Sequence, residues 1–225
     1  VTCADYAISE KIIMELREFF PTDDFCSEES PEQTSTTKEL KAKYAWVLDP
    51  VDGTNNYALG LPFCAISLAL LKQGMPIYGY VYDYARDTII HGGPAVGLFE
   101  DNKKVKTINR PLNQQNSILG LHFPLRPEDQ ESLLPILQSY RLRSLGSGAL
   151  LLAYTATGQL DGVYDHKVKV WDIAAGAAMA QVAGRDLCFL GSSPFPLTSF
   201  QTPSEVLPYY AGSPDFCELM KKTMP

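Results

Sequence analysis

The chain is predicted to have an α/β fold, and the prediction rests on one observation from each half of the sequence. Apolar runs of strand length, separated by Gly, Pro and Asp, crowd the first half and predict an antiparallel sheet with one long helix. Strand and helix patterns alternate through the second half, as they do in α/β proteins. A chain of 225 residues can bury a large core. We therefore expect a single domain over 1–225, built from two packed halves, 1–114 and 115–225.

A helix is expected first in chain order. In residues 6–20, YAISEKIIMELREFF, the apolar positions recur with the spacing of one helical face, and Pro21 follows. The polar stretch 30–43 has almost no aliphatic side chains and is expected to be a mobile surface loop, with a lid over a site as the less frequent alternative. Strands are predicted at 44–48, 63–71, 77–84 and 87–91.

The second half alternates strand and helix from residue 117 to residue 190. Strands are predicted at 117–122, 141–145, 160–165 and 186–190. Helices are predicted at 129–140, 147–158 and 172–184, and the last of these is rich in Ala and Gly. The sequence contains no internal repeat, so a repeat architecture is not expected.

Composition and charge argue against several classes of function. The net charge of -7 provides no basic surface for nucleic acid or for an anionic membrane, and we expect neither partner. The longest apolar run, 63–71, is far shorter than the about 18 residues of a membrane span, and no signal peptide opens the chain, so a cytoplasmic protein is expected. The five cysteines include no C-x-x-C pair and the three histidines share no ligand spacing, which argues against a zinc site or a disulfide framework.

Two aspartates at the end of a predicted buried strand are the first candidates for chemistry. Asp49 and Asp52 flank Pro50, which disfavours a helical conformation at Asp49, so both carboxylates and a backbone carbonyl can converge on one point. Gly53 permits close approach of the backbone, and the free N–H groups after it can hold a phosphate. The spacing D-x-x-D-G-T favours metal ligation over the D-x-D-x-T arrangement of a covalent aspartyl nucleophile. Solvated aspartates in a turn are the simpler alternative.

Two further acidic motifs are ambiguous when each is considered alone. Asp172 stands at the start of a predicted helix, where it can serve as an N-cap worth about 1 kcal/mol or as a metal ligand. Glu28 and Glu29 are adjacent in a stretch that would otherwise be interpreted as surface loop. Their meaning depends on the other motifs of the chain.

Taken together, the motifs resemble those of the inositol monophosphatase family of magnesium-dependent, lithium-sensitive phosphatases. In chain order they are V-T-x-x-D (1–5), E-E-S (28–30), W-V-L-D-P-V-D-G-T-N-N (46–56), G-S-G-A (146–149) and W-D-I-A-A-G (171–176). The resemblance covers essentially the whole chain and begins at Val1, without the N-terminal helices that usually precede this pattern. It implies a layered αβαβα sandwich of the inositol monophosphatase and fructose bisphosphatase type, acting as one catalytic domain. A dication between Asp49 and Asp52 would explain why two repelling carboxylates are tolerated there.

The resemblance also implies a set of metal ligands. Glu28, Asp49 and the Val51 carbonyl would hold one Mg²⁺, and Asp49, Asp52 and Asp172 a second, in a site of two or three ions. Oxygen ligands suit this hard cation. Water activated by a cation would then attack phosphorus in line.

Further roles follow from the same resemblance. Asp5 and Thr54 would orient and deprotonate the attacking water, and the amides of Gly53 and Thr54 would bind the phosphate. Ser27 replaces the glycine that usually precedes the glutamate pair, and Glu28 rather than Glu29 is expected to be the ligand. The alcohol side of the site is expected to be lined by Gly146, Ser147, Gly148 and Asp165, the last where the family often has a longer Glu.

We therefore expect Mg²⁺-dependent hydrolysis of a small phosphomonoester, inositol monophosphate-like, without a covalent phosphoenzyme. Histidinol phosphate and a nucleotide 3′-phosphate are the alternative substrates. A non-catalytic binding or regulatory family member is the alternative of another class. The expected partner is a small-molecule phosphate ester, and we allow for a homodimer. All the expected catalytic side chains are present, which favours an enzyme.

Overall fold

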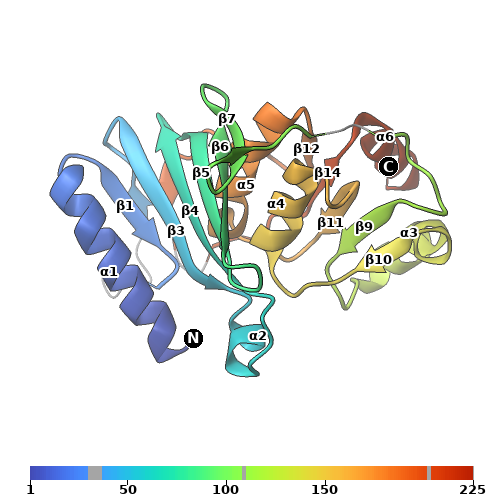
Figure 1. The fold of residues 1–225 in the computed structure, drawn as a ribbon, viewed down its shortest axis with the longest axis horizontal. Helices are drawn as coiled ribbons and strands as arrows, with labels where there is room; N and C mark the ends of the chain where they lie inside the picture. Colours follow the sequence, from blue (N-terminus) through green and yellow to red (C-terminus); the bar gives the residue numbers. More distant parts are fainter. Residues whose placement is uncertain (30–36, 108–109, 202–203, 225) are drawn as a thin grey trace.

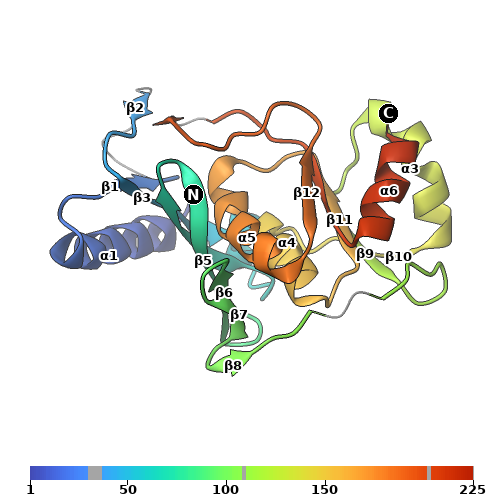
Figure 2. The same cartoon turned by 90° about the horizontal axis from the view of Figure 1, so that it is seen from above.

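The computed structural model describes residues 1–29, 37–107, 110–201 and 204–224. Its layers follow one another as helix, sheet, helices, sheet, helices (Figure 1). Helix α1 (Cys3–Phe19) lies on the outer side of the first sheet, and α4 (Gly148–Thr157) and α5 (Val170–Ala183) lie between the two sheets. Helices α3 (Pro127–Ser139) and α6 (Pro214–Thr223) cover the outer side of the second sheet, as the view from above also shows (Figure 2). The predicted αβαβα sandwich is confirmed.

Within the described residues, the first sheet has seven strands in the order β1-β3-β4-β5-β6-β7-β8. Strand β1 is parallel to β3, and every other neighbouring pair is antiparallel, so the predicted antiparallel half is largely confirmed. The strands are β1 (Asp24–Ser27), β3 (Tyr44–Asp52), β4 (Ala65–Lys72), β5 (Met75–Asp83), β6 (Thr88–Gly93), β7 (Gly97–Glu100) and β8 (Lys103–Lys104).

Strand β3 extends further than the sequence predicts. It was expected to stop at Leu48, before the aspartates, but it continues to Asp52. Its pairing with β4 is regular up to Asp49, which pairs with Ser67, and resumes only at Asp52, which pairs with Ala65. Between these two pairs β3 advances by three residues and β4 by two, so β3 carries a β-bulge here. Pro50, which lacks an N–H to donate to β4, lies inside this irregular stretch.

The second sheet has five strands in the described residues, in the order β10-β9-β11-β14-β12. Strands β9, β10 and β11 are parallel, as the alternating pattern predicts. The sequence analysis missed β14, which runs antiparallel between β11 and β12, and also α6 after it. The strands are β9 (Ile118–Leu121), β10 (Arg141–Arg143), β11 (Gly162–Asp165), β12 (Asp186–Phe189) and β14 (Tyr209–Gly212).

A small two-stranded sheet joins β2 (Lys38–Glu39) to β13 (Ser199–Phe200). Strand β2 lies inside the stretch 30–43 that was expected to be a loop. Residues 30–36 of that stretch lie outside the described residues, so the lid stays a prediction.

The Ala-rich helix α5 packs directly on the first sheet. Ala174, Ala175 and Ala178 are fully buried. A Cβ atom at Gly79 of β5 would lie 2.2 Å from the carbonyl oxygen of Ala175, so only glycine fits where the helix crosses this strand. Ser67 of β4 donates a hydrogen bond of 3.1 Å to the carbonyl of Trp171, which fixes the start of α5 against the sheet.

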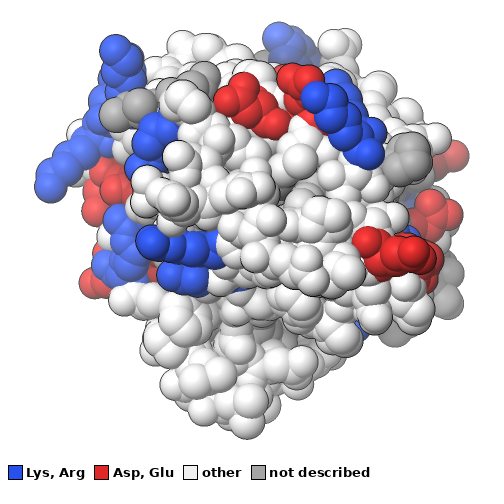
Figure 3. All heavy atoms as spheres, turned by 90° about the vertical axis from the view of Figure 1, so that its right-hand side faces the viewer, with Lys and Arg blue, Asp and Glu red and all other residues white. Residues whose placement is uncertain are grey.

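Membrane helices, disulfides and a basic surface were not expected from the sequence. Among the described residues no helix has both the length and the apolar character needed to cross a membrane. All five cysteines are free thiols. On the face shown in Figure 3, Lys and Arg side chains are interspersed with Asp and Glu. The absence of a nucleic-acid partner stays a prediction.

Candidate active site

Two of the predicted site aspartates lie at the end of β3. The Asp49 side chain is buried, at 2% exposure, and its Oδ1 accepts a hydrogen bond of 3.0 Å from the Val51 amide. Asp52 closes the strand after the bulge, and its Oδ2 accepts two short hydrogen bonds, one of 2.5 Å from the Ser147 hydroxyl and one of 2.6 Å from the Ala149 amide. The N-terminus of α4 therefore holds the Asp52 carboxylate.

The third aspartate comes from the first turn of α5. Asp172 lies two residues after the helix begins at Val170, and its Oδ2 accepts a hydrogen bond of 2.7 Å from the Lys169 amide. Ligand oxygens of Asp49, Asp52 and Asp172 all lie within 4.8 Å of one another. Residues separated by about 120 positions in the sequence thus meet at one point, as the family resemblance implied.

The electrostatics of this cluster are unfavourable without a cation. Burial, followed by repulsion from Asp52 and Asp172, raises the pKa of Asp49 well above its ordinary value. Burial, followed by repulsion from Asp52, does the same to the pKa of Asp172. Burial raises the pKa of Asp52 to about 6, although the bonds from Ser147 and Ala149 oppose the shift. Such mutual repulsion is relieved by protons or by a bound cation.

Glu28 adds a fourth carboxylate at the end of β1. Its amide donates to the Leu48 carbonyl at 3.1 Å, which places it beside β3. Burial and then repulsion from Glu29 and Asp52 raise the pKa of Glu28 to about 7, and its side chain also interacts with Asp49. The pKa of Glu29 is raised by burial and by Asp5. This arrangement favours Glu28 as the ligand.

The residues predicted to handle water and phosphate lie directly after the bulge and in the first turn of α1. Gly53 has φ +86°, and a Cβ atom there would lie 2.9 Å from the Phe63 carbonyl oxygen, so the left-handed turn and the close approach both require glycine. Helix α2 (Thr54–Ala58) follows it. The Thr54 hydroxyl donates to the Val51 carbonyl at 2.9 Å. The Asp5 carboxylate is buried and accepts bonds of 2.6 and 2.5 Å from the amide and hydroxyl of Thr2 at the start of α1.

Ser147 makes a contact that the sequence analysis did not predict. It caps α4 and its hydroxyl donates to Asp52, while its expected place on the alcohol side of the site stays a prediction. The sequence analysis also missed the Ala149 amide, and it missed Asn56, whose side-chain nitrogen donates to the carbonyls of Phe63 and Leu145 at 2.7 Å each. A serine before an apolar helix is a cap signal that could have indicated the first of these contacts.

Gly146 and Gly148 flank this serine. A Cβ atom at Gly146 would lie 2.8 Å from the Asn56 amide nitrogen. At Gly148 a Cβ atom would lie 2.8 Å from the Val168 side chain, 3.6 Å from Cβ of Asp172 and 3.8 Å from Oδ2 of Asp165, so this glycine lies close to both acids.

Asp165 lies beside the acidic cluster. It is 1% exposed, and its Oδ1 accepts a hydrogen bond of 2.9 Å from the Lys167 amide. Its Oδ2 has no hydrogen-bond partner among the described residues. His122, which no sequence signal singled out, places Nδ1 3.5 Å from this oxygen. A buried carboxylate oxygen without a partner is suited to accept a bond from a ligand hydroxyl.

The comparisons with known proteins agree with the geometry. The Nus factor SuhB of Pasteurella multocida is 31% identical over 208 residues, which cover 88% of this chain and 75% of that protein. The inositol-1-monophosphatase of Mesorhizobium japonicum is 30% identical over 190 residues, which cover 82% of this chain and 70% of that protein. The crystal structure of the extragenic suppressor protein suhB from Bartonella henselae superposes with a TM-score of 0.82 at 26% identity, covering 100% of this chain and 84% of that one. The model of the inositol monophosphatase family matches residues 1–202, and the chain belongs to this family.

Proposed function

We propose that this chain hydrolyses a small phosphomonoester with Mg²⁺ held by Asp49, Asp52 and Asp172. The convergence of their oxygens within 4.8 Å carries the proposal. Two unit charges about 4 Å apart repel by about 1 to 4 kcal/mol at effective dielectrics of 80 to 20. A dication bound between these carboxylates would offset this repulsion and keep them charged.

The donor set fits Mg²⁺. Every proposed ligand offers oxygen, including the Glu28 carboxylate and the Val51 carbonyl, and hard cations prefer oxygen. The Val51 carbonyl has a second lone pair available beside the one that accepts from Thr54. Bound Mg²⁺ supplies charge neutralisation and lowers the pKa of water.

The side chains of this chain have distinct roles in the proposed reaction. Hydrogen bonds from Ser147 and Ala149 favour the charged form of Asp52. The Thr54 hydroxyl gives its hydrogen to Val51, so it presents lone pairs to the attacking water and orients it. Asp5 is proposed to take the proton, and the amides of Gly53 and Thr54 to bind the phosphate.

Asp165 is proposed to contact the alcohol part of the substrate. Its Oδ2 accepts no hydrogen bond from the described residues, with His122 Nδ1 3.5 Å away, and this favours a hydroxyl donor on that moiety. Lys169 is less suited to bind a second anionic group, because its ammonium donates to the Ser204 carbonyl at 2.7 Å. A hydroxyl-bearing alcohol such as inositol would supply the donor that Asp165 can accept.

A regulatory role without catalysis is the second candidate, because several relatives are named Nus factor SuhB. Phosphate release decides between the two. We expect release from at least one of inositol phosphates, histidinol phosphate, sugar phosphates and adenosine bisphosphates, with Mg²⁺ present and not with a chelator. Asp186→Asn, which changes an exposed carboxylate of β12, is the control variant and should retain activity. Release from none of these esters would favour the regulatory role.

A further inference from the structure

Helix α4 is held by two carboxylates of the first sheet. Near its N-terminus Asp52 accepts bonds from Ser147 and Ala149, and further along the helix Asp83 accepts a hydrogen bond from the Tyr154 hydroxyl. Ala65 of β4 pairs with Asp52 on one side and with Asp83 on the other. Residues paired across neighbouring strands point to the same face of a sheet, so both carboxylates face the helix layer.

Asp83 is a buried group with a defined set of partners. It has 0% exposure. The Arg86 guanidinium lies 3.9 Å from its Oδ2, and the same guanidinium lies 5.9 Å from the centre of the Tyr154 ring. Burial and then the bond to Asp83 raise the pKa of Tyr154, which keeps its hydroxyl protonated and donating. A buried carboxylate would be strongly destabilising without such partners.

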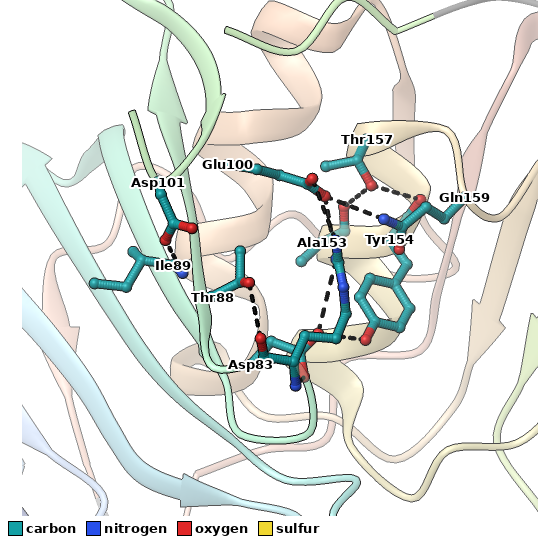
Figure 4. Close-up of polar contacts among 10 residues, drawn as sticks. Asp83, Thr88, Ile89, Glu100, Asp101, Ala153, Tyr154, Thr157 and Gln159 are labelled. Carbon is teal, nitrogen blue, oxygen red and sulfur yellow. Dashed lines mark hydrogen bonds and ion pairs between the residues drawn. The ribbon is translucent and has the colours of Figure 1, made fainter. Parts of the chain in front are cut away.

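The Asp83–Tyr154 contact is supported by further hydrogen bonds nearer the surface. Arg86 donates two bonds, of 3.1 and 3.2 Å, to the Glu100 carboxylate of β7. Gln159, just after α4, donates to the same carboxylate at 3.1 Å. In Figure 4, Asp83 and Tyr154 point toward each other, and Glu100 and Gln159 lie on the far side of the same network. Two strands and the C-terminal part of α4 are therefore tied together.

We propose that Asp83 and Tyr154 are positioning residues, which set α4 along the first sheet so that the Ser147 hydroxyl and the Ala149 amide meet Asp52. The inference rests on the proposed function in that Asp52 is taken as a metal ligand. A helix transmits a displacement along its axis, and hydrogen bonds as short as those to Asp52 weaken when donor and acceptor move by a few tenths of an ångström. Neither Asp83 nor Tyr154 belongs to the proposed ligand set.

Tyr154→Phe tests this directly, because it removes only the hydroxyl. Tyr82→Phe is the matched control, since it removes a hydroxyl that donates to Asp87 at 2.9 Å and lies on the same strand as Asp83. The first measurement is hydrogen exchange of the metal-free proteins at the first amides of α4. We expect the Ala149 amide to exchange about threefold faster or more in Tyr154→Phe and at the wild-type rate in Tyr82→Phe, as local opening predicts. Unchanged exchange in Tyr154→Phe would overturn the proposal.

The second measurement is the Mg²⁺ dissociation constant by calorimetry. Loss of a direct partner of a metal ligand commonly weakens binding by about 10- to 100-fold. Tyr154 acts one contact further out, so we expect a Kd about 3- to 10-fold higher in Tyr154→Phe. Combined with Ser147→Ala, its effect should be less than additive, because both changes act on the same bond to Asp52. A lower melting temperature with wild-type exchange and affinity would make Tyr154 merely structural and overturn the proposal.

Glu100→Gln provides a second variant should Tyr154→Phe fail to fold. It weakens the Arg86 clamp from the surface, and the same changes in exchange and affinity are expected with smaller size. No change in either measurement would count against the proposal. If wild-type protein binds Mg²⁺ and the variants respond as expected but no ester is hydrolysed, the proposed function is wrong and the positioning role stands.

Discussion

Replacing Asp49 by Asn should stabilise the metal-free protein. Asp49 is buried and surrounded by the carboxylates of Asp52, Asp172 and Glu28, and its raised pKa records the cost of charging it. In the wild type the Val51 amide donates to Asp49 Oδ1 at 3.0 Å, and the side-chain oxygen of Asn can accept the same hydrogen bond. The substitution therefore removes the negative charge at this position and keeps the contact with the backbone.

The magnitude follows from the repulsion that is removed. Each close pair contributes about 1 to 4 kcal/mol, and protonation of the neighbours relieves part of this, so we take about 2 kcal/mol for the whole substitution at pH of about 8. For a chain of this length 1 kcal/mol moves the melting temperature by about 2 to 4 °C, which predicts a rise of about 4 to 8 °C. In the wild type, Mg²⁺ at about a hundredfold excess over Kd should add about 2.7 kcal/mol, and the variant should lose most of that gain.

Thermal unfolding of both proteins, in chelator and in Mg²⁺, measures both effects. Asp129→Asn is the matched control, because Asp129 is equally buried but accepts bonds from Arg126 and Tyr164 that outweigh burial and lower its pKa. This control should lower the melting temperature and leave the response to Mg²⁺ intact. If Asp49→Asn instead lowers the metal-free melting temperature and keeps the full Mg²⁺ response, Asp49 is a structural residue and the metal assignment is wrong.

Three further outcomes are expected. Asp172→Asn should fold normally but lose turnover by about 100-fold or more, and retention of more than about a tenth of the activity at saturating Mg²⁺ would contradict its role. Lithium should inhibit in the millimolar range and excess Mg²⁺ should also inhibit, as the family resemblance implies for a site in which one ion leaves with phosphate; a flat lithium titration would count against it. The metal-free protein should become more stable as pH falls from about 8 to about 6, because the folded pKa values of Glu28 and Asp52, about 7 and about 6, lie above their ordinary values and the folded state binds protons more tightly. Melting curves across pH with and without Mg²⁺ measure this trend, which saturating Mg²⁺ should reduce; an opposite slope would refute it.

The fold was predictable where the pattern was long or strongly periodic. Helix α1 shows one apolar face, and α5 shows an unbroken run of small residues, so both were found. Strand β14, with YYAG, and the short strand β1 carry too few residues for a period to show. The extent of β3 was missed because Pro50 ordinarily ends a strand, whereas here a bulge accommodates it.

The candidate site was predictable from motifs rather than from periodicity. Asp49 and Asp172 lie close together only because α5 packs on the first sheet. The spacing of these residues in the sequence could not predict this proximity, whereas the family resemblance predicted it. The hydrogen-bond partners of Asp52 were not predicted. A serine before a helix can cap that helix or donate to a neighbouring carboxylate, and the sequence does not show which carboxylate lies next to Ser147. His122 was missed because its place beside Asp165 depends on β9 lying next to β11.

The position of β14 has a consequence for how the chain acquires its fold. This strand fills the gap between β11 and β12, yet it begins at Tyr209, after both of them and after the family-matched segment. While the chain emerges from the ribosome, β11 and β12 are made well before the strand that joins them. Until residues 209–212 arrive, each of these strands has an open edge on the side that β14 will occupy. The second sheet is therefore expected to close last, and the nascent chain to be most prone to aggregation just before this happens.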